Sequence, residues 1–267
     1  MRLILLDPVV TSRITLEVSV TTPDEAVRAG AAGADRLELC AALEVGGVTP
    51  SAGTLLRSRE RLESTPIYVL VRPRTGDFCY SDFEFDTILR DADWFMSNGA
   101  DGIVCGVLNS RGQIDDVRSL ELIHASRGKC VFHRAFDFMP DQFVALEHLI
   151  ELGFERVLTS GGETTALTGA ARIAELVRRA AGRIEILPGA GINPENVAEL
   201  IRATGCTQIH GSFRAVVTDQ TFTTNPALAA QMGQRMTTDA EQVRTVRAIL
   251  DNLTAADSGL RHPSHGQ

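Results

Sequence analysis

Charged and polar residues alternate with apolar ones inside short segments of the sequence, at positions where they could perform acid–base chemistry. In DRLELC, Arg36, Glu38 and Cys40 alternate with leucines. Because successive side chains of a β-strand point to opposite faces, the leucines should pack on a helix layer and the polar set should point into a barrel. The same alternation predicts further inward-facing residues, namely Glu17, Ser19, Arg72, Arg74, His133, Ser160 and His210.

The loops after two of these segments add candidate groups. They are Arg72, Arg74, Asp77 and Tyr80 in RPRTGDFCYSD, and His133, Arg134 and Asp137 in HRAFD. Arginine forks match carboxylate or phosphate groups, and a histidine beside a carboxylate can move protons near neutral pH. The predicted catalytic set is therefore Glu17, Glu38, Arg72, Arg74, Asp77, His133, Asp137 and His210.

These residues favour an enzyme that acts on a small anionic metabolite, phosphorylated or not. In this hypothesis Glu38 or His133 takes a proton, and His210 orients the substrate or returns a proton. Arg72 and Arg74 hold the anion. We expect lyase, isomerase or hydrolase chemistry without a nicotinamide or flavin cofactor, because the sequence contains neither a dinucleotide-binding fingerprint nor a convincing divalent-metal triad.

Glycine-bearing turns supply candidate anion-binding amides in LTSGGETTA, LPGAGINPENV and HGSFRA. Backbone amides in such turns, helped by a helix N-terminus near Asn193, would point at a phosphate or carboxylate. Phosphate sites in barrels commonly use the turns after strands seven and eight. The predicted set is Ser160, Gly161, Gly162, Gly189 and Gly191, with Gly211 in the last turn. Glycine also serves any tight turn, so ordinary turns remain the alternative.

The inward charges have a structural interpretation as well. Burying unpaired charge is costly, so these groups must pair, hydrate or hold a ligand. An internal salt-bridge network would satisfy them without any chemistry, and a third alternative is a scaffold whose barrel has lost its reaction.

Eight strand-like segments alternate with helical ones, which is the pattern of βαβ units and of a parallel sheet. The segments begin at Ile14, Asp35, Ile67, Asp101, Cys130, Arg156, Ile184 and Thr207, and the helices near Pro23, Ser51, Ser81, Asp115, Pro140, Thr164, Asn193 and Thr238. This predicts an α/β protein with a single (β/α)8 TIM barrel over residues 14–254. Residues 1–13 would form an N-terminal extension and residues 255–267 a disordered tail. The long linker from Ala215 to Thr237 would be a lid or a surface excursion.

The composition excludes several classes of function. The net charge of −8 argues against nucleic-acid and membrane partners, which are polyanions. The one lysine, Lys129, opens a strand, whereas barrel chemistry lies where strands end, so a Schiff-base aldolase is rejected. Five cysteines without a CxxC pair, and no secretory signal, indicate reduced thiols in a cytoplasmic protein.

Several segments together resemble the copper homeostasis protein CutC family. They run in order from about Ile14 to His210: LEVSV, GADRLELCAALEVGGVTPS, VRPRTGDFCYSD, FHRAFD, GFERVLTSGG and LPGAGINPENV. The resemblance implies a TIM barrel, a cytoplasmic location, a homo-oligomer and an association with copper homeostasis through Cu(I) binding. It attaches no reaction to the fold.

One departure from the family pattern bears on copper. Family members often read LEVC where this chain reads LEVS, so Ser19 stands where a thiol is expected. Cu(I) prefers soft thiolate or thioether ligands, usually at least two. Cys40 is the candidate metal ligand, with Cys79 or Cys105 as partners only if they face the same pocket. Cys40 is equally consistent with a small buried apolar residue. A copper-handling protein and an enzyme for a small anionic ligand are thus the two hypotheses.

Overall fold

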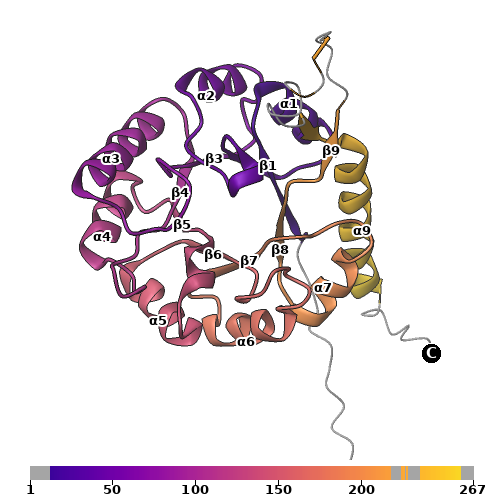
Figure 1. The fold of residues 1–267 in the computed structure, drawn as a ribbon. Helices are drawn as coiled ribbons and strands as arrows, with labels where there is room; N and C mark the ends of the chain where they lie inside the picture. The colour runs from indigo at the N-terminus through magenta and orange to yellow at the C-terminus, as the bar shows by residue number, and fades with distance from the viewer. Residues whose placement is uncertain (1–12, 218–223, 226, 228–234, 260–267) are drawn as a thin grey trace, which may run out of the picture.

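Eight parallel strands form a ring in the computed structural model, which describes residues 13–217 and 235–259 together with residues 224, 225 and 227. Their order is β7-β6-β5-β4-β3-β2-β1-β8, and β7 lies beside β8, which completes the ring (Figure 1). The strands are β1 Thr15–Val20, β2 Arg36–Leu39, β3 Ile67–Leu70, β4 Gly102–Cys105, β5 Cys130–Phe132, β6 Arg156–Thr159, β7 Glu185–Pro188 and β8 Gln208–Gly211. The predicted (β/α)8 TIM barrel is confirmed.

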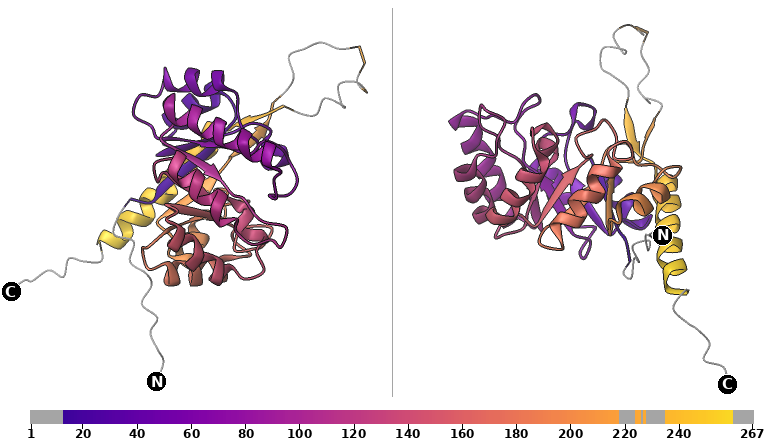
Figure 2. Two further views of the ribbon diagram at one scale, coloured as in Figure 1. Left: turned by 90° about the vertical axis from the view of Figure 1, so that its left-hand side faces the viewer. Right: turned by 90° about the horizontal axis from the view of Figure 1, so that it is seen from below.

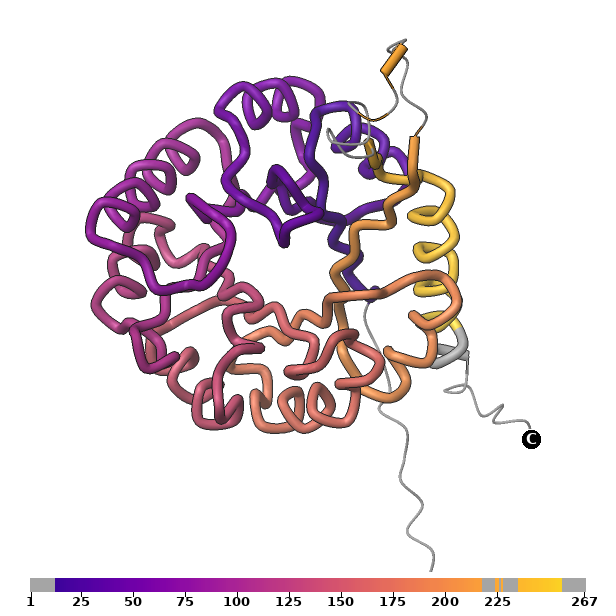
Figure 3. The backbone as a smooth tube through the Cα atoms, viewed as in Figure 1, coloured from indigo at the N-terminus to yellow at the C-terminus, as the bar shows by residue number. Residues whose placement is uncertain are grey.

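Helices cover the outside of the ring, as the tube drawing also shows (Figure 3). They are α1 Pro23–Ala31, α2 Ala52–Arg59, α3 Asp82–Ser97, α4 Asp116–Ala125, α5 Gln142–Leu152, α6 Ala170–Ala180, α7 Val197–Thr204 and α9 Ala240–Gly259, with short 3-10 turns η1 Leu43–Val45 and η2 Arg134–Phe138. Polar residues cap the N-termini of several of these helices. At the start of α3, for example, the Ser81 hydroxyl accepts a hydrogen bond from the Glu84 amide in a capping box. In the described part of the chain, no helix combines the length and apolar character needed to cross a bilayer.

Two helix starts and one domain boundary differ from the predictions. Helix α6 begins at Ala170, not near Thr164, because the Thr165 and Thr168 hydroxyls bond each other and nearby amides in a turn of their own. Helix α7 likewise begins at Val197, after Asn193 and Asn196 have bonded the intervening amides. Helix α9 continues past residue 254, where the tail was predicted to begin. Residues 1–12 and 260–267 lie outside the described residues.

A small antiparallel pair occupies both ends of the predicted linker. Strand β9, Arg214–Val216, pairs with β10, Met236–Thr238. Figure 2 shows this pair at the end of the barrel opposite to the end where α9 finishes. Most of the linker between the two strands lies outside the described residues.

The two faces of each strand meet different surroundings. Leu16, Leu37 and Leu39 belong to the large apolar layer between strands and helices. A smaller apolar cluster fills the barrel interior and contains Cys40, Tyr68, Leu70, Val104 and Val131. Polar side chains share this inner side, and they concentrate near β1, β2 and β8.

Candidate active site at the carboxyl ends of the strands

A cavity of about 630 Å³ opens at the carboxyl ends of the strands. Five of the residues that line it carry polar side chains from the predicted inward set: Ser19, Glu38, Arg72, His133 and His210. This volume suits a small metabolite. The cavity therefore collects polar residues from three strands, β1, β2 and β8, and from the segments that follow β3 and β5, at the end of the barrel where this fold places its chemistry.

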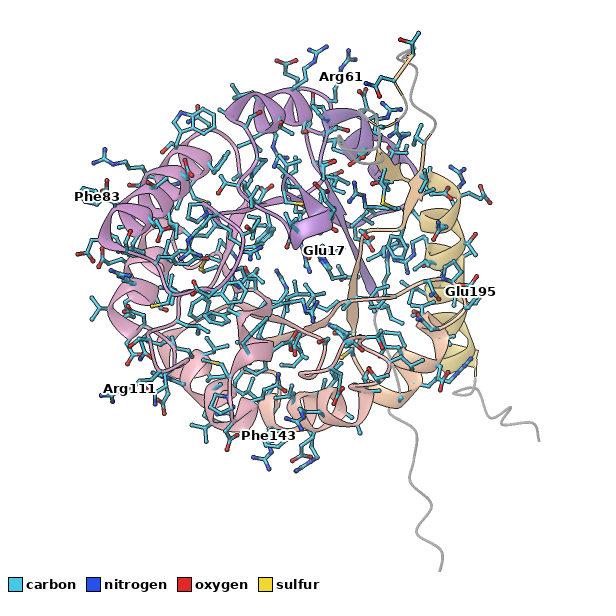
Figure 4. All side chains as sticks on the ribbon, viewed as in Figure 1. Glu17, Arg61, Phe83, Arg111, Phe143 and Glu195 are labelled. Atoms are coloured by element: carbon cyan, nitrogen blue, oxygen red, sulfur yellow. The ribbon has the colours of Figure 1, made fainter. Side chains whose placement is uncertain are left out.

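Glu17 lies beneath the cavity and is fully engaged. Its carboxylate forms an ion pair with Arg36 and accepts a hydrogen bond of 2.7 Å from Nδ1 of His210. Arg36 also donates to Gln208 at 2.8 Å. Burial opposes ionisation of Glu17, but Arg36 and the His210 hydrogen bond outweigh it and hold the pKa of Glu17 well below its usual range. Glu17 thus positions His210 and does not itself reach the cavity (Figure 4 shows it near the centre of the ring).

The charges below Glu17 form a structural network. Arg156, which is 3% exposed, donates to Glu185 at 2.7 Å. Tyr68 lies under the guanidiniums of Arg156 and Arg36 and donates to Glu155 at 2.8 Å. Pairing of this kind is what a buried charge requires. The salt-bridge interpretation of the inward charges therefore holds for this lower layer.

Glu38 differs from Glu17 although both are buried. It is 6% exposed and lines the cavity, and no described residue donates a hydrogen bond to its carboxyl group. Burial, assisted by the Glu17 carboxylate, raises the pKa of Glu38 to about 7. Burial lowers the pKa of His210, but the Glu38 and Glu17 carboxylates outweigh it and raise that pKa. Glu38 and His210 can therefore exchange protons with a ligand near neutral pH.

His133 is held as a neutral hydrogen-bond donor. Its Nδ1 accepts from the Ala135 amide at 3.2 Å, so the ring proton resides on Nε2, which has no partner among the described residues. Burial and the nearby Arg72 guanidinium lower the pKa of His133 to about 3, and the ring packs on Phe78 at 4.8 Å. Of the two residues predicted to take a proton, the geometry favours Glu38.

Arg72 lines the cavity, but Arg74 and Asp77 do not. The Arg72 guanidinium donates to the carbonyls of Gly47 and Gly76 at 2.8 and 2.9 Å, which fixes it beside Phe78. Arg74 instead binds Glu84 at 2.6 Å and Asp77 at 3.1 Å. The strand alternation ends at Leu70, and the chain then turns outward toward α3, so the predicted role of Arg74 and Asp77 at the site is not supported.

Asp137 occupies the turn that was predicted to bind an outside anion. Its carboxylate accepts from the amides of Ser160 and Gly162 at 3.1 Å and from the Thr159 hydroxyl at 2.5 Å. The Gly161 amide donates to the Thr159 hydroxyl at 2.9 Å. The structure thus gives no support to the predicted anion binding by Ser160, Gly161 and Gly162, because Asp137 and Thr159 already accept from their amides.

Asp137 also does not reach the cavity, which corrects its predicted catalytic role. It instead positions Arg134, whose Nε lies 2.8 Å from a carboxylate oxygen of Asp137 and whose Nη2 donates to Ser160 at 2.9 Å. Arg134 lines the cavity and was left out of the predicted catalytic set. The HRAFD motif contains it, but the sequence does not show which of its charged residues turns inward.

The turns after β7 and β8 do line the cavity. Gly189 is occupied in packing, since its amide donates to the Thr159 carbonyl at 3.0 Å and an added Cβ would meet Leu158. Gly191 and Gly211 line the cavity. Sequence reasoning missed their neighbours in the wall: Ala190, Ile192, Ser212, Phe213, Arg214 and Gln242. The HGSFRA turn was the available signal for three of these.

Cys40 does not have the surroundings of a Cu(I) ligand. It is fully buried, its Sγ lies 3.7 Å from the Val20 carbonyl, and burial raises the pKa of its thiol well above the usual value. Cys105 contacts Cys130 at 3.3 Å, and Cys79 is exposed. In the described part of the chain, no second sulfur contacts Cys40. One neutral thiol and the Ser19 hydroxyl make a poor match for the two soft ligands that Cu(I) prefers.

Three side chains come close enough to suggest a cation site that the sequence analysis did not expect. Glu17, Glu38 and His210 each bring one potential ligand atom within 4.8 Å of the others. Glu17, however, already uses its two oxygens for Arg36 and His210. The Arg36 guanidinium already supplies the positive charge that pairs with Glu17, so we assign no metal to this cluster.

Comparison with known proteins identifies relatives over most of the chain. The CutC family model matches residues 14–215. A CutC family protein of Treponema denticola is 50% identical over 201 residues, which cover 74% of this chain and 80% of that protein. One from Xanthomonas campestris pv. campestris is 43% identical over 236 residues, which cover 88% and 98%. A solved CutC structure from Streptococcus agalactiae, for which a role in copper homeostasis has been suggested, matches with a TM-score of 0.70 at 35% identity and covers 74% of this chain and 98% of that one.

Proposed function

Because the chain belongs to the CutC family, whose name attaches no reaction to the barrel, we propose from the cavity that it is an enzyme acting on a small anionic metabolite by general acid–base catalysis. The observation that carries the proposal is the Glu38 carboxyl group, which is buried, has no hydrogen-bond donor among the described residues and lines the cavity. A buried acid of this kind is unfavourable for stability and suited to proton transfer.

The neighbouring residues divide the remaining work. Glu38 takes a proton from the bound ligand, and His210, held by Glu17, gives one back. The neutral His133 donates from Nε2 to a ligand oxygen on which negative charge develops. Arg72 and Arg134 contribute positive charge to the wall. This arrangement suits an isomerase or a lyase, with hydrolysis as the third class that the residues permit.

The test is a metabolite screen with a matched pair of variants. The protein is incubated in D2O with small phosphorylated and carboxylated metabolites, and NMR detects conversion or exchange of carbon-bound hydrogen. Glu38→Gln should lower the rate on any active compound by roughly 10²- to 10⁴-fold, the range for loss of a general base. The exposed control Glu60→Gln should leave the rate unchanged. Conversion that is equally fast in Glu38→Gln would refute the assignment.

Copper binding is the second candidate, and it rests on the family name and on Cys40. Its support is the position of Cys40 in the barrel interior, next to the Leu70 side chain that lines the cavity. Anaerobic Cu(I) titration against a competing chelator tests it, with Cys40→Ser alongside. Tight one-to-one binding that is lost in the variant would establish copper handling. Weak binding that ignores Cys40, which the isolated thiol leads us to expect, would reject it.

Location and assembly complete the proposal. The five cysteines are all unpaired in the structure, which is consistent with a reducing cytoplasm. A homo-oligomer would cover apolar side chains that stand exposed near the starts of neighbouring helices, among them Phe83 of α3, Val117 of α4 and Val144 of α5. Light scattering coupled to gel filtration measures the assembly directly.

A further inference from the structure

We propose that the ligand is a phosphate monoester, with its phosphate group bound by the turns after β7 and β8 and by Arg214. This inference rests on the proposed function and names the chemical class of its ligand. The two turns lie side by side, because β7 and β8 are neighbours in the barrel, and both line the cavity that contains Glu38.

The turn after β7 has an unusual backbone. Ala190 and Gly191 follow one another with φ angles of 90° and 69°, a region that residues with a side chain rarely adopt. An alanine in this conformation is strained, which is typical of functional turns. Within the described residues, nothing accepts a hydrogen bond from the amides of Gly191 and Ile192.

The turn after β8 repeats these features. Phe213 has a φ of 44°, which is unusual for a bulky residue, and it is 3% exposed. Gly211 is required there, since an added Cβ would lie 2.4 Å from the Phe213 ring. The amides of Ser212 and Phe213 also have no acceptor in the part of the chain that the structure describes. Two adjacent turns that line the cavity thus contain four amides without an acceptor among the described residues.

Arg214 supplies the positive charge at this corner. Its side chain is 13% exposed, yet its contacts are long: 3.7 Å to Glu44 and 3.5 Å to the Met236 carbonyl. Its buried Nε has no partner among the described residues. A guanidinium removed from water needs close acceptors, and a pair of phosphate oxygens is a bidentate acceptor that matches its geometry.

The number and charge of the donors favour phosphate over carboxylate. Four amides and a guanidinium match the three peripheral oxygens and up to two charges of a phosphate monoester, whereas a carboxylate offers two oxygens and one charge. The cavity of about 630 Å³ is larger than a phosphate group, so the remainder of the ligand can extend toward Glu38 and His133.

Inorganic phosphate is the probe that tests this site without knowledge of the substrate. Calorimetry at constant ionic strength should show saturable binding of phosphate, at least tenfold tighter than that of acetate. Arg214→Met should weaken phosphate binding at least tenfold. Arg118→Met should leave it within twofold, because Arg118 is similarly buried and paired with Asp82 but lies away from the cavity.

Amide NMR of the unmodified protein gives a second readout that does not depend on a folded variant. Phosphate should shift the signals of Gly191, Ile192, Ser212 and Phe213, and it should leave those of Ser160 and Gly162 in place, since Asp137 already occupies them. Equal affinity for acetate, binding unaffected by Arg214→Met, or shifts confined to other residues would each overturn the phosphate site.

Different experimental results would refute the phosphate site and the proposed reaction. Glu38→Gln should still show saturable phosphate binding that Arg214→Met weakens, because the two turns and Arg214 hold the phosphate and Glu38 belongs to the reacting part of the cavity. Phosphate binding without conversion of any metabolite would preserve this site and remove the reaction. Conversion of a metabolite by a protein that ignores phosphate would do the opposite.

Discussion

Two regions at the same end of the barrel use similar residues in opposite ways. At the mouth of β6, Asp137 receives hydrogen bonds from backbone amides, a hydroxyl and Arg134, so its carboxylate is satisfied. At the mouth of β2, Glu38 is as deeply buried and receives none from any described residue. The first carboxylate stabilises the fold, and the second remains for a ligand. Unsatisfied polar groups, more than polar groups as such, mark the candidate site.

Removing the satisfied carboxylate should have the largest effect on stability. Asp137→Ala leaves two amides, the Thr159 hydroxyl and Arg134 without their acceptor. We expect a loss of about 3 kcal/mol in the free energy of unfolding, as for other buried charges whose partner is removed. Urea denaturation measures it. A loss below that of a typical surface substitution would show that the β6 turn does not depend on Asp137.

Replacing Glu38, the unsatisfied carboxylate, should raise the free energy of unfolding instead of lowering it. The pKa of Glu38 is about 7 in the folded protein and near 4.5 when unfolded, so the folded state binds more protons in that interval. Wild-type stability should therefore fall as the pH rises from about 4.5 to 7, and Glu38→Gln should escape this contribution. We expect the variant to gain on the order of 2 kcal/mol over the wild type between pH 4 and pH 8, as measured by urea unfolding. A difference that is constant with pH would contradict the assignment.

An exposed carboxylate in the loop after β3, Asp77, should contribute least to stability and to ligand binding. The Asp77 side chain is 75% exposed, pairs with Arg74 at the surface and accepts a hydrogen bond of 3.4 Å from the Cys79 amide. Asp77→Ala should change the free energy of unfolding by less than about 0.5 kcal/mol and leave phosphate affinity unchanged. Denaturation and calorimetry together check this. A large loss of ligand affinity in this variant would show that the loop after β3 contributes to the binding site.

The fold and the inner face of the strands could be predicted from the sequence because both follow from local periodicity. Glu38 lines the cavity because it alternates with buried leucines in a strand. The loops could not be predicted in this way. The amides of Ser160 and Gly162 are satisfied by Asp137, which is more than twenty residues earlier in the chain, and no local pattern reveals that contact. Arg74 was misplaced for a related reason, since alternation carries no information beyond Leu70, where the strand ends.

The turns after β7 and β8 show a further limit. Their glycines were recognised, but the strained residues Ala190 and Phe213 carry no signal of their conformation in the sequence. The role of Arg214 likewise could be inferred only from the folded structure, in which its contacts are long and its Nε has no partner among the described residues. The site assignment depends on how many hydrogen-bond partners each polar group has. That number is a property of the folded chain and cannot be counted in the sequence.

We assign Glu38 as an unsatisfied acid that titrates near neutrality in the cavity. Carbon-13 NMR of the labelled glutamate carboxyl groups, with Glu38→Gln used to assign the signal, measures this directly. We predict a titration midpoint near pH 7, which inorganic phosphate should perturb when it binds in the same cavity. A midpoint at or below the usual glutamate value of about 4.5 would show that Glu38 is satisfied like Asp137, and the assigned acid–base role would be lost.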